Sequence, residues 1–96
     1  VDVMAPFSRE IGCHPHEYER GLHLAYPGGV AGGPMAFTVR DGPVTLQVSL
    51  EVLPERVIAL MRLPLLKADF RFEGGSRDER EAFLRHLDLA TQRGGG

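Results

Sequence analysis

Hydrophobic and polar residues alternate with a period of two through most of the second half of the chain. The first run covers Val44–Val52, the second Val57–Leu63 and the third Leu66–Glu73. Alternation at this period places one side of a β-strand in the core and the other side in water. Pro54 and Pro64 separate the runs, and proline has no N–H for a strand ladder, so both are predicted to lie at strand ends. The pattern predicts three consecutive strands of an antiparallel meander.

Further strands are predicted on both sides of a glycine-rich segment. Met35–Arg40 alternates in the same way, and Asp41-Gly42-Pro43 is a turn signal that joins this strand to the meander. Val1–Ala5 is predicted to be the first strand, and 7–13 a connection. Residues 28–34 hold four glycines and one proline, which is typical of a flexible connector.

Two amphipathic helices are also predicted. Pro15–Ala25 begins with proline, which suits the first helical position, and carries an apolar stripe at helical spacing. The second helix begins at Ser76, because Ser76 and Glu79 form the sequence signature of a capping box. Its apolar stripe consists of Phe83, Leu84, Leu87 and Ala90. Residues 94–96 are three glycines, predicted to be a frayed tail.

These elements give the order β-α-β-β-β-β-α within a single domain, residues 1–96. We expect an α+β fold with one antiparallel sheet and both helices packed on one face. The first strand is expected to join the last strand of the meander, which gives the spatial order 2-3-4-5-1. This order resembles the half-repeat of TATA-binding-protein-like (TBP-like) folds and a short helix-grip fold. The resemblance is one of topology and implies no functional residue.

Composition and charge narrow the classes of partner. The formal net charge is −2 and no segment is strongly basic, so we expect no nucleic-acid partner. No apolar run approaches the length of a membrane span, so no membrane partner is expected. A single cysteine, Cys13, allows no disulfide within the chain, which favours a reducing compartment and predicts a cytoplasmic protein. No pattern calls for a cofactor.

The favoured hypothesis is a non-catalytic binding or protein-interaction module. Ile58 and Leu60 are apolar residues at positions of the outer sheet face, which is otherwise polar, and Arg62 lies two positions further on. Apolar residues on an otherwise polar face are typical of a contact surface, so Ile58, Leu60 and Arg62 are predicted to contact a protein partner or a second copy of the chain.

Two alternatives stay open. A small apolar ligand could bind between the sheet and the helices, in a pocket lined by Tyr18, Met61, Phe70, Phe72 and Phe83. A metal- or thiol-dependent activity could instead use the segment that holds Cys13, His14, His16, Glu19 and His23. Zinc and copper accept such ligands, and a thiol just before a helix N-terminus is expected to have a lowered pKa.

Overall fold

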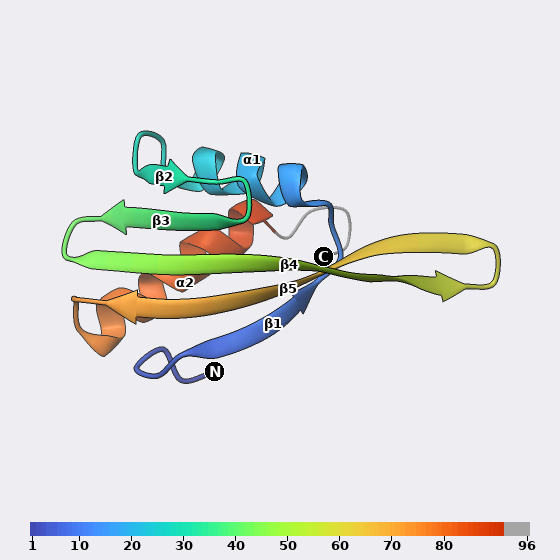
Figure 1. Ribbon diagram of the computed structural model, residues 1–96. Helices are drawn as coiled ribbons and strands as arrows, with labels where there is room; N and C mark the ends of the chain where they lie inside the picture. The colour runs from blue at the N-terminus through green and yellow to red at the C-terminus, as the bar shows by residue number, and fades with distance from the viewer. Residues whose placement is uncertain (92–96) are drawn as a thin grey trace.

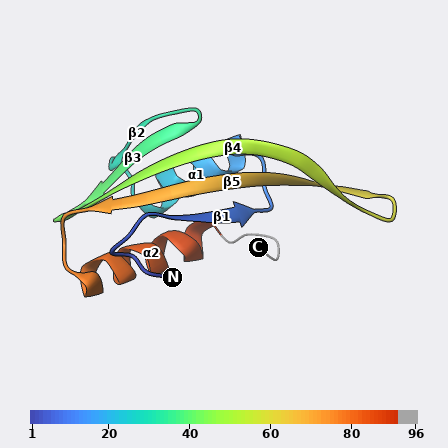
Figure 2. The same cartoon turned by 60° about the horizontal axis from the view of Figure 1, so that its bottom comes forward.

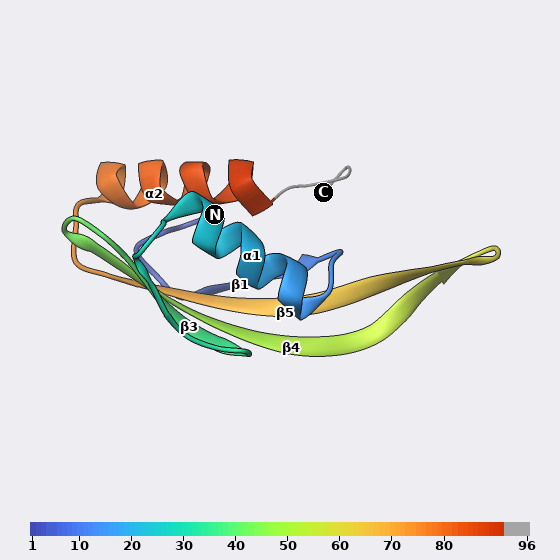
Figure 3. The same ribbon diagram turned by 90° about the horizontal axis from the view of Figure 1, so that it is seen from above.

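The structure, a computed structural model, describes residues 1–91; the predicted frayed tail 94–96 lies outside the described residues. Its elements in chain order are β1 (Phe7–Ile11), α1 (Pro15–Ala25), β2 (Val30–Gly32), β3 (Ala36–Asp41), β4 (Val44–Ile58), β5 (Met61–Glu73) and α2 (Arg77–Thr91). The strands form one antiparallel sheet in the order β1-β5-β4-β3-β2, and both helices lie on one face (Figures 1 and 3). The predicted α+β class, the element order and the spatial order 2-3-4-5-1 are confirmed.

The core lies between the helices and the face of the sheet that they cover, which we call the inner face. Val48 of β4 lies opposite Phe37 of β3 and Phe70 of β5, and all three are almost fully buried. The helices contribute the buried side chains of Tyr18, Leu22, Ala25, Phe83, Leu84 and Leu87. The period-two runs and the two apolar stripes therefore meet in one core, as alternation and helical spacing predict.

Both helices begin with capping interactions. The N–H of Ser76 donates to the Glu79 carboxylate (2.8 Å), and the N–H of Glu79 donates to the Ser76 hydroxyl (3.2 Å). The capping box predicted for α2 is therefore present. At α1 the Glu17 carboxylate accepts a hydrogen bond from the N–H of His14 (2.9 Å). These contacts satisfy N–H groups that have no partner inside the helix.

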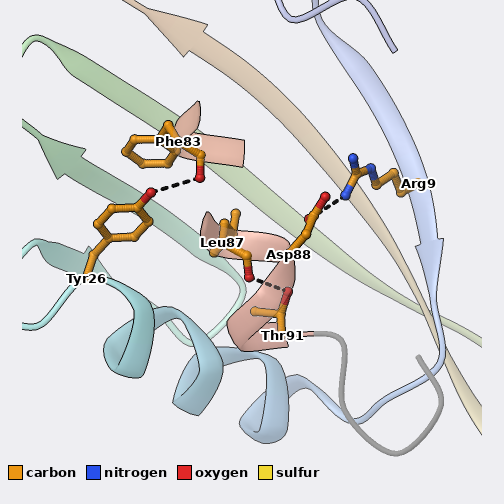
Figure 4. A network of polar contacts seen from close by, with 6 residues as sticks. All are labelled: Arg9, Tyr26, Phe83, Leu87, Asp88 and Thr91. Atoms are coloured by element: carbon orange, nitrogen blue, oxygen red, sulfur yellow. Dashed lines mark hydrogen bonds and ion pairs between the residues drawn. The ribbon is translucent and has the colours of Figure 1, made fainter. Parts of the chain in front are cut away.

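The first strand was predicted at the wrong place. Residues 1–5 form no strand; β1 is Phe7–Ile11, which the sequence pattern assigned to a connection. Phe7, Arg9 and Ile11 point to the inner face, and Arg9 there forms an ion pair with Asp88 of α2 (2.7 Å; Figure 4). Its guanidinium also lies 5.6 Å from the ring centre of Phe70. The strand was not recognised from the sequence because Arg9 faces inward, whereas the alternation pattern assumes that a charged residue faces outward.

The segment 28–34 was predicted to be a flexible connector, yet it contains strand β2. Val30 pairs with Val39 of β3, and Gly32 pairs with Phe37. The N–H of Arg40 donates to the carbonyl of Gly29 (2.8 Å), which extends the pairing by one step. Strand pairing uses backbone groups that glycine also has, so glycine content alone did not reveal this edge strand.

The meander contains two long strands where three shorter ones were predicted. The predicted strand 57–63 spans the turn between β4 and β5, so the chain reverses within it. The ladder shifts register between Leu53 and Arg56, so Pro54 lies at a β-bulge inside β4, and Pro64 lies inside β5 at the same level. Proline is tolerated where the ladder is already interrupted, so here the prolines mark a bulge and not strand ends.

Candidate functional site

The β4–β5 hairpin extends well beyond the rest of the sheet. The pairing of β3 with β4 ends at Ser49, and that of β1 with β5 ends at Leu66. The remaining two-stranded ribbon, residues 51–65, is called the arm (Figures 1 and 2, olive and yellow). It accounts for the elongated shape of the molecule, whose principal extents are 45 × 26 × 20 Å. Neither helix covers the arm in any of the views.

The outer face of the sheet changes from polar to apolar at the base of the arm. On the body, the outer face consists of cross-strand pairs of polar residues, the last of which is Glu51 with Lys67. The next outward pair is Leu53 with Leu65. Residues directly opposite each other in an antiparallel ladder share a face, so the register also assigns the following pairs. The apolar side chains on this side, which we call the outer strip, are Leu53, Ile58, Met61, Leu63 and Leu65.

The opposite face and the end of the arm are apolar as well. Val57 pairs with Arg62, one step from the Ile58–Met61 pair, and therefore faces the other way. Val57, Ile58 and Met61 are 59%, 53% and 58% exposed, and Leu60 in the turn is fully exposed. The arm holds five of the nine large hydrophobic residues that are exposed in the described part of the chain. Contiguous apolar surface of this kind is typical of an interaction site.

The arm also carries four charged residues, of which Arg56 lies opposite Leu63 on the outer face itself. Arg62 lies 3.6 Å from Glu55, and Arg56 lies 4.0 Å from Glu10 of β1. All four side chains are more than half exposed, so each ion pair contributes little to stability. Glu51 has no ion pair among the described residues.

The predicted contact residues Ile58, Leu60 and Arg62 all lie at the end of the arm. They do not share one face, because Ile58 belongs to the outer strip whereas Arg62 faces the inner side. The sequence prediction did not include Val57 and Met61. The available signal was the run 57–61, five consecutive apolar residues between two arginines.

The residues predicted to line an apolar pocket are not brought together around a cavity. Tyr18, Phe70, Phe72 and Phe83 are buried in the core, where Phe72 and Phe83 pack edge to face (5.6 Å between ring centres). Met61 lies beside the turn of the arm, exposed. Burial raises the pKa of Tyr18 well above its ordinary value, because the charged phenolate is disfavoured in the core.

A shallow groove of about 560 Å³ lies beside the β3–β4 turn, at the other end of β4 from the arm. Its walls include Phe83, but none of the other residues predicted for a ligand pocket. Arg40, Asp41, Glu79 and His86 line it together with apolar residues such as Pro43 and Val44, so its walls are of mixed character. In its wall, the Tyr26 hydroxyl donates to the carbonyl of Phe83 (2.8 Å; Figure 4).

The predicted metal ligands lie around the start of α1. The rings of His14 and His16 stack with their centres 5.6 Å apart, and His23 lies 3.8 Å from Glu19 one helical turn away. Within residues 1–91, no three histidine, cysteine or acidic side chains gather closely enough to hold a metal ion.

Cys13 is half-buried and packs against the core. Burial, with the nearby negative charge of Glu17, raises the pKa of the Cys13 thiol above its ordinary value. The sequence had predicted a lowered pKa from the helix dipole, so the direction is the reverse of the one expected. A raised pKa reduces the thiolate fraction that a nucleophile or metal ligand needs.

Comparison with known protein families and with curated proteins finds no match to this sequence. Neither of the described helices has the length and apolar character required to span a membrane. The arm is the most distinctive feature in the geometry of the chain.

Proposed function

We propose that this protein is a non-catalytic interaction module that binds a protein partner through the arm. The observation that carries the proposal is the position of the apolar residues: they cover both faces and the turn of a ribbon that lies outside the core. The other period-two runs bury one face in the core, whereas five large apolar side chains of the arm are exposed: Val52, Val57, Ile58, Leu60 and Met61.

The free energy gained by burying apolar side chains favours binding of a partner to the arm. Full burial of a Val, Leu, Ile or Met side chain stabilises a protein by about 1.5–3 kcal/mol. In the isolated chain Val57, Ile58, Leu60 and Met61 are all more than half exposed, so much of this stabilisation is missing. A two-stranded hairpin is also only marginally stable by itself in water. Binding to an apolar surface would bury these side chains and order the ribbon together.

The charges on the arm favour a protein over a nucleic acid. Residues 51–65 carry Arg56 and Arg62 against Glu51 and Glu55, so the arm has no net formal charge. Phosphate backbones are bound by clustered cations, which this ribbon lacks. Apolar side chains combined with a few charges of both signs are compatible with a protein–protein interface.

Photo-crosslinking in the cells that make the protein tests this function. p-Benzoylphenylalanine replaces Leu60 in one version and Glu73 in a control, since Glu73 is exposed at the other end of β5. We expect a discrete protein adduct, identified by mass spectrometry, from position 60 only, and we expect Ile58→Glu in the same chain to abolish it. The proposal is wrong if position 60 yields no adduct, or if Ile58→Glu leaves the adduct unchanged.

A further inference from the structure

The strand pairing determines which N–H groups of β1 point out from the edge of the sheet. The N–H of Leu50 donates to the carbonyl just before β3 (2.7 Å), so it points away from β5. Opposite residues in an antiparallel ladder exchange both hydrogen bonds or neither, so the N–H of its partner Ala68 points toward β1. Ala68 pairs with Arg9, whose N–H therefore points toward β5. Because the direction alternates along a strand, the N–H groups of Ser8 and Glu10 point outward, where β1 ends the sheet (Figure 1).

The other free edges of the sheet are poorly suited to strand pairing. By the same alternation, positions 54 and 64 present their backbone nitrogens at the two edges of the arm, and both are proline, which has no N–H. At the opposite side of the sheet, β2 has three residues, and its last residue, Gly32, has a φ of 92°, so the extended backbone ends there. Edge prolines and very short edge strands both prevent unwanted pairing. β1 has five residues, none of them proline or glycine, so it lacks both protections.

The side chains of β1 leave this edge open and partly apolar. Phe7 and Ile11 point to the inner face and pack, partly buried, against the core; the Phe7 ring stacks on that of Phe70 with the centres 5.0 Å apart. An inward-pointing charge can also block an edge, but Asp88 holds the guanidinium of Arg9 over its own protein (2.7 Å; Figure 4). An added strand would therefore continue the apolar surface of the core beside Phe7 and Ile11.

We propose that the edge of β1 is a second interaction site, at which an extended segment of another protein adds a sixth strand to the sheet. The outward N–H and carbonyl groups of Ser8 and Glu10 bind the backbone of this segment. Its inward side chains are apolar and lie beside Phe7 and Ile11. In strand addition, backbone hydrogen bonds provide affinity and alternate side chains provide specificity. The site lies on the body of the fold and does not depend on the function of the arm.

The sequence of β1 favours another protein over a second copy of this chain. Two β1 edges around a two-fold axis use both outward N–H groups of each copy only when Ser8 of one lies opposite Glu10 of the other. This register places Arg9 directly opposite its own copy, in the more closely spaced, non-hydrogen-bonded type of pair. Like charges in such a pair destabilise it. A segment of another protein avoids this repulsion when the residue opposite Arg9 is neither lysine nor arginine.

Proline at an outward position removes the N–H that a partner strand requires and leaves the donors to β5 in place. Glu10→Pro makes this change, whereas the control Glu10→Ala removes the same side chain, which lies 4.0 Å from Arg56, and keeps the N–H. Proline is tolerated in an edge strand where its nitrogen faces solvent. We therefore expect both variants to fold, as circular dichroism and urea unfolding can show.

Photo-crosslinking in the cells that make the protein tests the site, with p-benzoylphenylalanine in place of Ser8, which is exposed beside the edge. We expect an adduct with another protein that is retained in Glu10→Ala and weakened at least about tenfold in Glu10→Pro. Mass spectrometry should locate the crosslink in a segment whose apolar residues alternate. The reciprocal pair, with the photoreactive residue at position 10 and Ser8→Pro compared with Ser8→Ala, repeats the measurement should Glu10→Pro fail to fold.

Three results would overturn the proposal. No adduct from either position means that nothing binds at this edge, and an adduct that the proline variants leave unchanged means contact through side chains instead of strand pairing. An adduct only with the chain itself identifies a second copy as the partner. The function of the arm is judged separately, because the adduct from position 60 is expected to be the same in Glu10→Pro and Glu10→Ala.

Discussion

The arm should be dispensable for folding, because none of its residues belongs to the buried core. Core residues of β4 end at Leu50 and those of β5 begin at Leu66. We therefore consider a variant in which the dipeptide Asn-Gly replaces residues Pro54–Pro64 and connects Leu53 to Leu65. These two residues lie opposite each other, and a two-residue Asn-Gly loop is the preferred connection for a tight hairpin.

The expected change in the free energy of unfolding is small. The deleted residues contribute backbone hydrogen bonds that water can replace, and their apolar side chains are exposed or half-buried and lie outside the core. We expect a change below about 1 kcal/mol, which for a domain of this size shifts Tm by less than about 4–8 °C. Phe70→Ala provides the contrast: Phe70 is 1% exposed, and its truncation is expected to cost about 3–5 kcal/mol.

Thermal and urea unfolding followed by circular dichroism measure both variants, with light scattering to record their oligomeric state. The shortened chain should unfold cooperatively, as the full chain does. A loss above about 3 kcal/mol, comparable to that of Phe70→Ala, would refute the reasoning, because the arm would then belong to the cooperative core.

Two further predictions concern the body of the fold. Gly42 and Gly74 both have positive φ (57° and 70°), but a Cβ at Gly42 meets nothing, whereas one at Gly74 overlaps the carbonyl oxygen of Pro43. Gly42→Ala should cost about 1–2 kcal/mol and Gly74→Ala at least about 1 kcal/mol more in urea unfolding; equal costs would contradict the overlap. The hydrogen bond from the His14 N–H lowers the pKa of Glu17, so its contribution to stability is present at neutral pH and is lost as pH falls through that lowered pKa. The Tm difference between wild type and Glu17→Gln should therefore shrink towards about pH 3, and a difference that grows in acid would contradict it.

Register explains why the proposed contact surface could be predicted from the sequence only in part. The sequence indicated Ile58 and Leu60 because apolar residues interrupted a polar pattern. It could not show that Ile58 and Met61 share a face while Val57 lies on the other, because that depends on which residues pair across the turn. A shift of one residue in pairing would exchange the two faces. The same dependence placed Met61 in a predicted pocket, although the structure places it on the arm.

Local sequence patterns determined those secondary-structure features that depend only on residues close together in the chain. The alternation in Val44–Val52 required a strand with one buried face, and Ser76 with Glu79 required a helix start, because spacing along the backbone settles both. Tertiary structure decided the rest. Arg9 faces the core because Asp88 of α2 is there to pair with it, and Pro64 lies inside a strand because a bulge in β4 lies beside it. Such outcomes depend on residues far apart in the chain, which no local pattern can bring together.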